Sequence, residues 1–171
     1  SVELCGLEFK AGQSYQVTLG KDLKDIFGNR LGRDVTFTWD NKGYCPNISF
    51  KGGFGVMESY LPARYPIKAI NAGGIEVEKQ LIDYKDFITF YKDEAPWCRK
   101  RQLKGDFLSN IITPNMERNI SVDTFINLAP ALNGGKYGFV FTQILNKHYY
   151  SDECWQSAFD NITDIGVSLK T

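Results

Sequence analysis

Residues 12–39 contain two stretches in which apolar and polar side chains alternate. The apolar positions are Tyr15, Val17 and Leu19 in the first stretch and Val35, Phe37 and Trp39 in the second. A period of two predicts half-buried β-strands, because successive side chains of a strand point to opposite faces. The connecting segment contains Gly28-Asn29, a pair that favours the positive φ values of a tight turn. A β-hairpin is therefore predicted for this part of the chain.

Two or three strands in about 40 residues cannot bury a hydrophobic core of their own. We therefore interpret residues 1–44 as the C-terminal part of an Ig-like β domain and expect the chain to be a piece of a longer, modular protein. The polar segment 40–46 contains glycine and proline and is typical of a linker. A domain boundary is predicted there, with a second domain over residues 45–171.

The second domain is interrupted by turn residues at short intervals, which is typical of an all-β antiparallel sandwich. Strands are predicted at 47–50, 55–61, 65–71, 75–84, 105–112, 118–128, 136–144 and 162–170, and 86–91 is a short helix or a further strand. Gly73-Gly74 indicates a hairpin between two of these strands. The strand at 136–144 is apolar on both faces and is predicted to be central. We expect the core to include Tyr137, Phe139, Phe141, Ile165 and Val167.

The charge balance excludes a general attraction to polyanions. The 20 basic residues equal the 20 acidic ones in number, so the chain has no net field toward nucleic acid or an anionic membrane. The one basic cluster, at 99–104, has Asp93, Glu94 and Asp106 beside it, which favours a solvated loop. No apolar run approaches the ~20 residues of a membrane span. We expect no nucleic-acid partner, and a membrane connection only through an anchor outside this chain.

The residues that could carry hydrolytic chemistry are few. His148 is the only histidine, and it falls in a polar bend without the Gly-x-Ser-x-Gly elbow of a serine hydrolase. The glycine-rich run at 51–55 lacks the Gly-Lys-Ser/Thr ending of a phosphate loop and is interpreted as a turn. A surface-loop histidine is the simpler interpretation of His148.

Two pairs of carboxylates could act as acid and base in glycoside cleavage, Glu76 with Glu78 and Asp83 with Asp86. The two glutamates alternate with apolar residues, as on the ordinary solvent face of a strand. We therefore predict no catalytic, cofactor-binding or metal-ligating residue, and no enzyme activity.

The four cysteines, at positions 5, 45, 98 and 154, form no Cys-x-x-Cys pair of the kind found in structural zinc sites. Cys98 and Cys154 each neighbour a tryptophan and lie in predicted loops of the second domain, so they are the first candidates for a disulfide. The alternative is that the cysteines are free and act as small apolar residues.

Three aromatic residues, Tyr149, Tyr150 and Trp155, cluster in one predicted loop region. Exposed aromatic rings stack on sugars, so carbohydrate binding is a candidate function. The alternative is that these rings pack under the loop.

Several segments, taken in order, resemble the N-terminal region of proteins of the bacterial alpha-2-macroglobulin family. In that family an Ig-like domain ends in a pattern similar to 12–17, 23–29 and 35–37, and a proline then leads into the first macroglobulin-like domain. The segments similar to the second of these domains are 60–71, 75–79, 135–140 and 163–170, and Asp-Ile-Gly-Val at 164–167 is the most telling.

Proteins of this family are large envelope proteins that trap or inhibit proteases, many through an internal thioester built from Cys-x-Glu-Gln. Cys5-Gly6-Leu7-Glu8 lacks the Glu-Gln pair at that spacing, so this chain does not carry the reactive bond. The resemblance implies a macroglobulin-like sandwich, preceded by a partial Ig-like unit, that serves as a non-catalytic structural module.

The partners implied by the resemblance are neighbouring β domains of the same parent chain and, through the parent, proteases. It implies no cofactor. The implied location is the cell envelope, either periplasmic or membrane-anchored on the extracytoplasmic side. The alternative function is an adhesion or carbohydrate-binding sandwich, and an enzyme that depends on His148 comes third.

Overall fold

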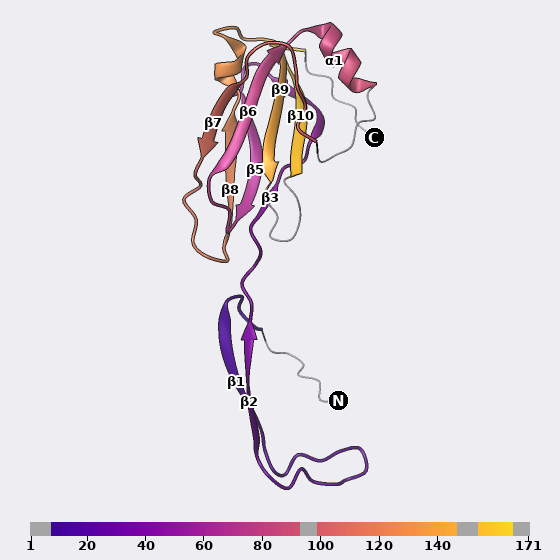
Figure 1. Cartoon of the computed structure of the whole chain (residues 1–171), viewed down its shortest axis with the longest axis vertical. Helices are drawn as coiled ribbons and strands as arrows, with labels where there is room; N and C mark the ends of the chain where they lie inside the picture. Colours follow the sequence, from indigo (N-terminus) through magenta and orange to yellow (C-terminus); the bar gives the residue numbers. More distant parts are fainter. Residues whose placement is uncertain (1–7, 93–98, 147–153, 166–171) are drawn as a thin grey trace. The chain divides into compact units, whose positions relative to one another are not determined.

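The computed structural model describes residues 8–92, 99–146 and 154–165. It divides into two compact units, one within residues 1–44 and the other within 45–171 (Figure 1). The assignment of the first unit to an Ig-like domain stays a prediction.

The first unit is a two-stranded antiparallel hairpin of β1 (Gln13–Leu19) and β2 (Val35–Asn41). The register places Tyr15 opposite Trp39, so the alternating apolar residues share one face, as their period requires. In the connecting loop the Asp25 carboxylate accepts hydrogen bonds from the side chain of Asn29 and from the backbone N–H groups of Asn29 and Phe27, and these bonds lower the pKa of Asp25. Only Gly28 of the Gly-Asn pair has a positive φ, at 86°.

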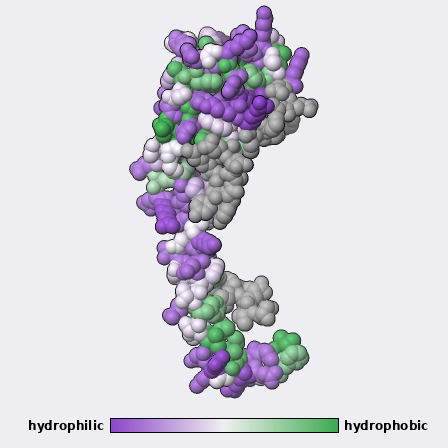
Figure 2. All heavy atoms as spheres, viewed as in Figure 1, coloured by the Kyte–Doolittle hydropathy of each residue, from purple (hydrophilic) through white to green (hydrophobic). Residues whose placement is uncertain are grey.

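The first unit does not bury its apolar side chains. None of its described residues is buried, and Phe37 and Trp39 are 45% and 41% exposed. Ile26 and Phe27, in the loop, are 93% and 81% exposed, and Figure 2 shows hydrophobic residues gathered on that loop. The predicted half-burial of the two strands is therefore only partly realised within this unit.

The second unit is an all-β sandwich of two sheets. One sheet has three strands, in the order β3 (Asn47–Ser49), β5 (Arg64–Ile70) and β8 (Ser121–Asn127). The other has five, in the order β4 (Gly53–Glu58), β10 (Cys154–Thr163), β9 (Gly138–Asn146), β6 (Ile75–Ile82) and β7 (Leu108–Ile112). All neighbouring strands are antiparallel except β4 and β10, which are parallel, a departure from the purely antiparallel prediction.

The main core lies between the two sheets and is built from alternate residues of their strands. Val77, Val140 and Ile144 face inward from the five-stranded sheet, and Ile67 and Ile126 face them from the other. Strand β9 has a neighbour on each side, which confirms its predicted central position.

The opposite, outer face of the five-stranded sheet is covered by α1 (Tyr84–Tyr91). The Asp83 carboxylate caps this helix by accepting from the backbone N–H of Asp86 at 2.8 Å. Phe87 and Phe90 of the helix pack with Phe141 and Phe159 in a second apolar cluster. A short 3₁₀ helix, η1 (Ala129–Leu132), follows β8. Within the described residues, no helix combines the length and apolar character that a membrane crossing requires.

Part of the predicted core is wrong. Tyr137 is 54% exposed because it precedes the start of β9, and Ile165 is 69% exposed because it follows the end of β10. Phe141 is fully buried and Phe139 partly so, but both belong to the outer cluster under α1. Val167 lies outside the described residues.

One predicted connection and the bounds of one predicted strand also differ. Strands β5 and β6, on either side of Gly73-Gly74, lie in different sheets, so that turn joins the two layers and is not a hairpin. The last strand begins at Cys154, earlier than the predicted 162–170. Its inward positions include Gln156 and Asp160, and these polar residues conceal the apolar alternation that marks a strand.

Candidate functional site

The structure describes only some of the predicted catalytic and binding candidates. His148, Tyr149 and Tyr150 lie outside the described residues. The Asp83 carboxylate caps α1 by accepting a hydrogen bond from the backbone N–H of Asp86, which lies in the first turn of that helix. These two carboxylates have a helix-stabilising arrangement and not that of an acid–base pair.

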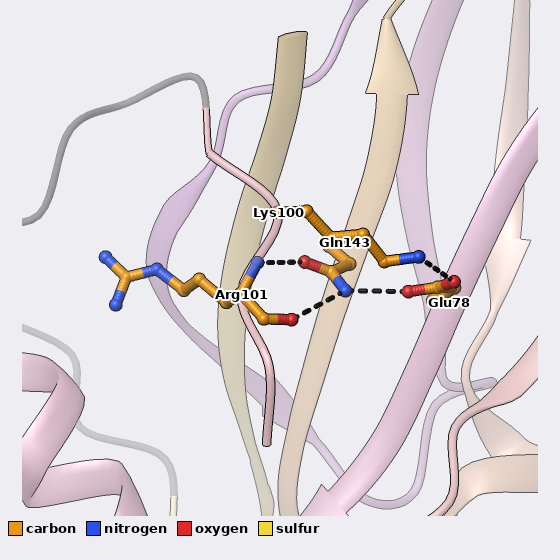
Figure 3. A network of polar contacts seen from close by, with 4 residues as sticks. All are labelled: Glu78, Lys100, Arg101 and Gln143. Carbon is orange, nitrogen blue, oxygen red and sulfur yellow. Dashed lines mark hydrogen bonds and ion pairs between the residues drawn. The ribbon is translucent and has the colours of Figure 1, made fainter. Parts of the chain in front are cut away.

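The main polar cluster lies on the outer face of the five-stranded sheet, where β6 and β9 meet the segment 99–104 (Figure 3). The side chain of Gln143, in β9, is fully buried. Its Nε2 donates to Glu78 Oε2 at 2.7 Å and to the backbone oxygen of Arg101 at 3.1 Å. Its Oε1 accepts from the backbone N–H of Arg101 at 3.0 Å. One glutamine amide thus binds both backbone polar groups of Arg101, as a neighbouring strand would.

The basic side chains of this segment are also engaged. Lys100 Nζ lies 2.6 Å from Glu78 Oε1 and 4.3 Å from the ring centroid of Trp155. The Arg101 guanidinium lies over the rings of Phe90 and Phe159, at 5.4 and 5.9 Å from their centroids. Such cation–π contacts bury the side-chain stems and hold the cations against the sheet.

Further contacts extend this attachment to residues 99–107, which we name the strap. Gln80 Nε2 donates to the backbone oxygen of Lys104 at 2.6 Å. Leu103 and Phe107 pack against the apolar cluster that also contains Phe141. The strap is therefore fixed to the sheet by two glutamine side chains and by its own apolar residues.

The interactions of this cluster attach the strap to the five-stranded sheet. Both carboxylate oxygens of Glu78 accept hydrogen bonds, one from Lys100 and the other from Gln143. The ring of Trp155, one of the three candidates for sugar stacking, has the ammonium group of Lys100 over it. In the part of the chain that the structure describes, no group of three or more His, Cys, Asp or Glu side chains could hold a metal ion. The cluster contains no nucleophile beside a base.

Sequence reasoning identified Glu78, the basic run and Trp155, but not the two glutamines that join them. Gln80 and Gln143 look like ordinary polar positions of strands, and nothing in their neighbours indicates that Gln143 is buried or that both bind the backbone of another segment. Gln143 is distinguished only by its place in a strand that also contains Phe139, Val140, Phe141, Ile144 and Leu145.

Two of the four cysteines, Cys45 and Cys154, lie among the described residues. Cys45 is free and exposed, whereas Cys154, the first residue of β10, is disulfide-bonded. Cys98 lies outside the described residues, so the pairing of Cys98 with Cys154 stays a prediction. The interpretation of the cysteines as free residues does not hold for Cys154.

The fold defines the class of protein that the chain resembles, a macroglobulin-type β-sandwich preceded by further β structure. No protein-family model and no curated protein sequence matches the chain. The likeness is found among solved structures, all of them bacterial alpha-2-macroglobulins.

Native alpha-2-macroglobulin of Escherichia coli, spanning domains MG0-NIE-MG1, matches 94% of this chain with 20% identity and a TM-score of 0.52. The native conformation of the same protein, from a cryo-EM reconstruction, matches 90% with 16% identity and a TM-score of 0.55. A mutant of Salmonella alpha-2-macroglobulin matches 93% with 14% identity and a TM-score of 0.65. The chain spans about half (53%) of the first of these chains and 10% and 9% of the other two. At these identities the likeness shows the fold.

Proposed function

We propose that the chain is a non-catalytic structural module of a bacterial alpha-2-macroglobulin-like protein. Residues 1–44 form the end of an Ig-like domain in this proposal, and 45–171 form a macroglobulin-like domain. The observation that supports it most is that the likeness to the Salmonella structure extends over 93% of the chain, and so includes residues of both units. The exposed apolar face of the first unit agrees with a missing remainder of that domain.

The proposed role of the parent is to trap or inhibit proteases in the cell envelope. The module contributes rigid spacing between neighbouring β domains and no chemistry of its own. A core between two sheets, a helix-covered outer face and a tied strap all support such a passive role.

The test uses the full-length parent with a broad-specificity protease. A protein that encloses a protease blocks the cleavage of large protein substrates more than the cleavage of small peptides. We expect the parent to slow digestion of a folded protein substrate while small-peptide hydrolysis continues, and the 171-residue chain alone to change neither rate.

Two results would contradict this proposal. Unimpaired digestion of the protein substrate in the presence of the parent would remove the inhibitor role. Specific binding of the chain to a glycan array, lost on Trp155→Ala or Tyr149→Ala, would establish the carbohydrate-binding function instead.

A further inference from the structure

The turn between η1 and β9 contains the one asparagine of the chain that is followed by glycine, Asn133-Gly134. Both residues are exposed. Asn133 has φ 50° and ψ 38°, and Gly134 has φ 83°, so both have positive φ values. Glycine adopts positive φ readily, and asparagine visits the left-handed region more often than most residues do. The pair therefore fits the turn that it forms, but the same pair is chemically reactive.

The two groups that would react have no competing contacts. Within the described residues, neither the side-chain amide of Asn133 nor the backbone N–H of Gly134 makes a hydrogen bond. A Cβ on Gly134 would have no heavy atom within 4 Å, so the space on that side of the residue is open. The Gly134 nitrogen can therefore lose its proton to a base in solvent without first giving up a partner.

We propose that Asn133 is a site of spontaneous deamidation, at which the backbone nitrogen of Gly134 attacks the side-chain carbonyl carbon Cγ of Asn133. The attack forms the N–Cγ bond of a five-membered succinimide, and the side-chain nitrogen of Asn133 leaves as ammonia. Water then opens the ring at either of its carbonyl carbons. Opening at Cγ gives aspartate, whereas opening at the backbone carbon gives isoaspartate, in which the main chain runs through the former side chain.

The sum of these steps exchanges one amide NH₂ group for OH, consumes one water and releases one ammonia. The reaction needs no oxidant, cofactor or enzyme. The proposal does not depend on the function of the parent.

The folded turn holds the two reacting atoms apart. Around the Cα–C bond of an L-residue, Cβ lies about 120° from the backbone nitrogen, so at ψ 38° the nitrogen of Gly134 lies nearly opposite Cβ of Asn133. Ring closure therefore requires a large rotation of ψ, which opens the turn. The hydrogen bond across the turn runs from the N–H of Gly135 to the oxygen of Leu132, at 2.8 Å. Residues 133–137 are all exposed, so this opening removes no side chain from the core.

The location of Asn133 gives the modification a structural consequence. The helix η1 follows β8 of the three-stranded sheet, and β9 belongs to the five-stranded sheet, so the turn is part of a crossing between the two layers. Leu132, directly before Asn133, is 7% exposed and belongs to the main core. Isoaspartate adds one carbon to the main chain between this anchored residue and β9, whereas aspartate adds only a negative charge.

The test follows the purified, folded 171-residue chain in mildly alkaline buffer by peptide mass spectrometry over several days, with fragmentation that separates isoaspartate from aspartate. The matched control within the chain is Asn115, which is also exposed but is followed by Met116. We expect Asn133 to convert at least about tenfold faster than Asn115, which corresponds to about 1.4 kcal/mol in activation free energy. Both products are expected at position 133, because direct hydrolysis of the side chain would give aspartate alone. The rate should rise with pH, since the Gly134 nitrogen attacks after it has lost its proton.

The variant Gly134→Ala places a methyl group beside the attacking nitrogen and is expected to slow the conversion of Asn133 by about tenfold. Its positive φ strains an alanine at this position, so the comparison of Asn133 with Asn115 in the unmodified chain keeps the test independent of the folding of the variant. Equal conversion at Asn133 and Asn115, aspartate without isoaspartate at position 133, or an unchanged rate in a folded Gly134→Ala chain would each overturn the proposal.

Discussion

The ammonium group of Lys79 donates a 2.7 Å hydrogen bond to the backbone oxygen of Asn127 and thereby joins the two sheets of the sandwich. Lys79 is 5% exposed, and its Nζ also donates to Asn110 Oδ1 at 3.0 Å on β7. Burial lowers the pKa of Lys79. A single side chain of β6 thus connects three strands at the end of the core.

The first prediction concerns this connection. Lys79→Ala removes the side-chain stem and both hydrogen bonds, and we expect it to lower the free energy of unfolding by about 2–4 kcal/mol. Lys79→Met keeps most of the stem and also removes the buried charge, so its loss should be smaller. Urea unfolding of the three proteins measures both. Equal losses for the two variants would mean that the hydrogen bonds, and not the stem, account for the stability.

The second prediction concerns the strap. Gln143→Leu removes the two hydrogen bonds that the Gln143 amide makes with the backbone of Arg101, and we expect a loss of about 1–3 kcal/mol in the free energy of unfolding. Release of the strap should also speed tryptic cleavage beside Arg99 and Lys100. Gln102→Ala, an exposed position on the same strap, is the matched control. Cleavage rates that do not differ between the two variants would contradict the attachment described for Gln143.

The third prediction concerns pH. Because burial raises the folded-state pKa of Asp160 to about 7, the folded chain binds more protons at this site than the unfolded chain between about pH 4 and pH 7. Its contribution to stability is therefore greatest at low pH and is lost as the pH rises toward 7. Asp160→Asn has no such titration. We expect the free energy of unfolding of the variant to rise by roughly 2 kcal/mol relative to that of the unmodified chain between about pH 5 and pH 8, measured by urea unfolding. A constant difference between the two proteins would show that Asp160 does not titrate in that range.

The fourth prediction concerns the first unit. Phe27→Ser is expected to change the free energy of unfolding of this chain by less than about 0.5 kcal/mol, because Phe27 is 81% exposed. In a longer piece of the parent that completes the proposed Ig-like domain, Trp39 should become shielded and its fluorescence should shift to shorter wavelength. An unshifted spectrum of Trp39 in the longer protein would argue against a missing partner for this face.

The sequence predicts the strands of this chain better than their pairing. The hairpin of β1 and β2 follows from strict alternation, and the central place of β9 follows from apolar residues on both of its faces. Strand β10 was concealed because Gln156 and Asp160 occupy inward positions. Whether Gly73-Gly74 closes a hairpin or crosses between sheets depends on which distant strands pair, which local sequence does not encode.

The candidate site was harder to predict for the same reason. The binding of Arg101 by Gln143 joins positions that are remote in sequence, and each looks like an ordinary surface residue when considered alone. The position of Asp160 next to Gly55 likewise depends on the pairing of strands from opposite ends of the domain. The prediction of a turn over the whole glycine-rich run at 51–55 is wrong, because β4 begins at Gly53 and pairs with β10 from the far end of the domain.

The parallel pair of β4 and β10 also has a consequence for biosynthesis. The two strands lie about 100 residues apart in the chain, so loop closure delays their contact until nearly the whole domain has left the ribosome. Until then β9 has an open edge of unpaired backbone groups, of the kind that recruits other chains. A nascent chain that stalls before Cys154 would therefore be prone to aggregate, and rapid arrival of the last strand protects the newly made domain.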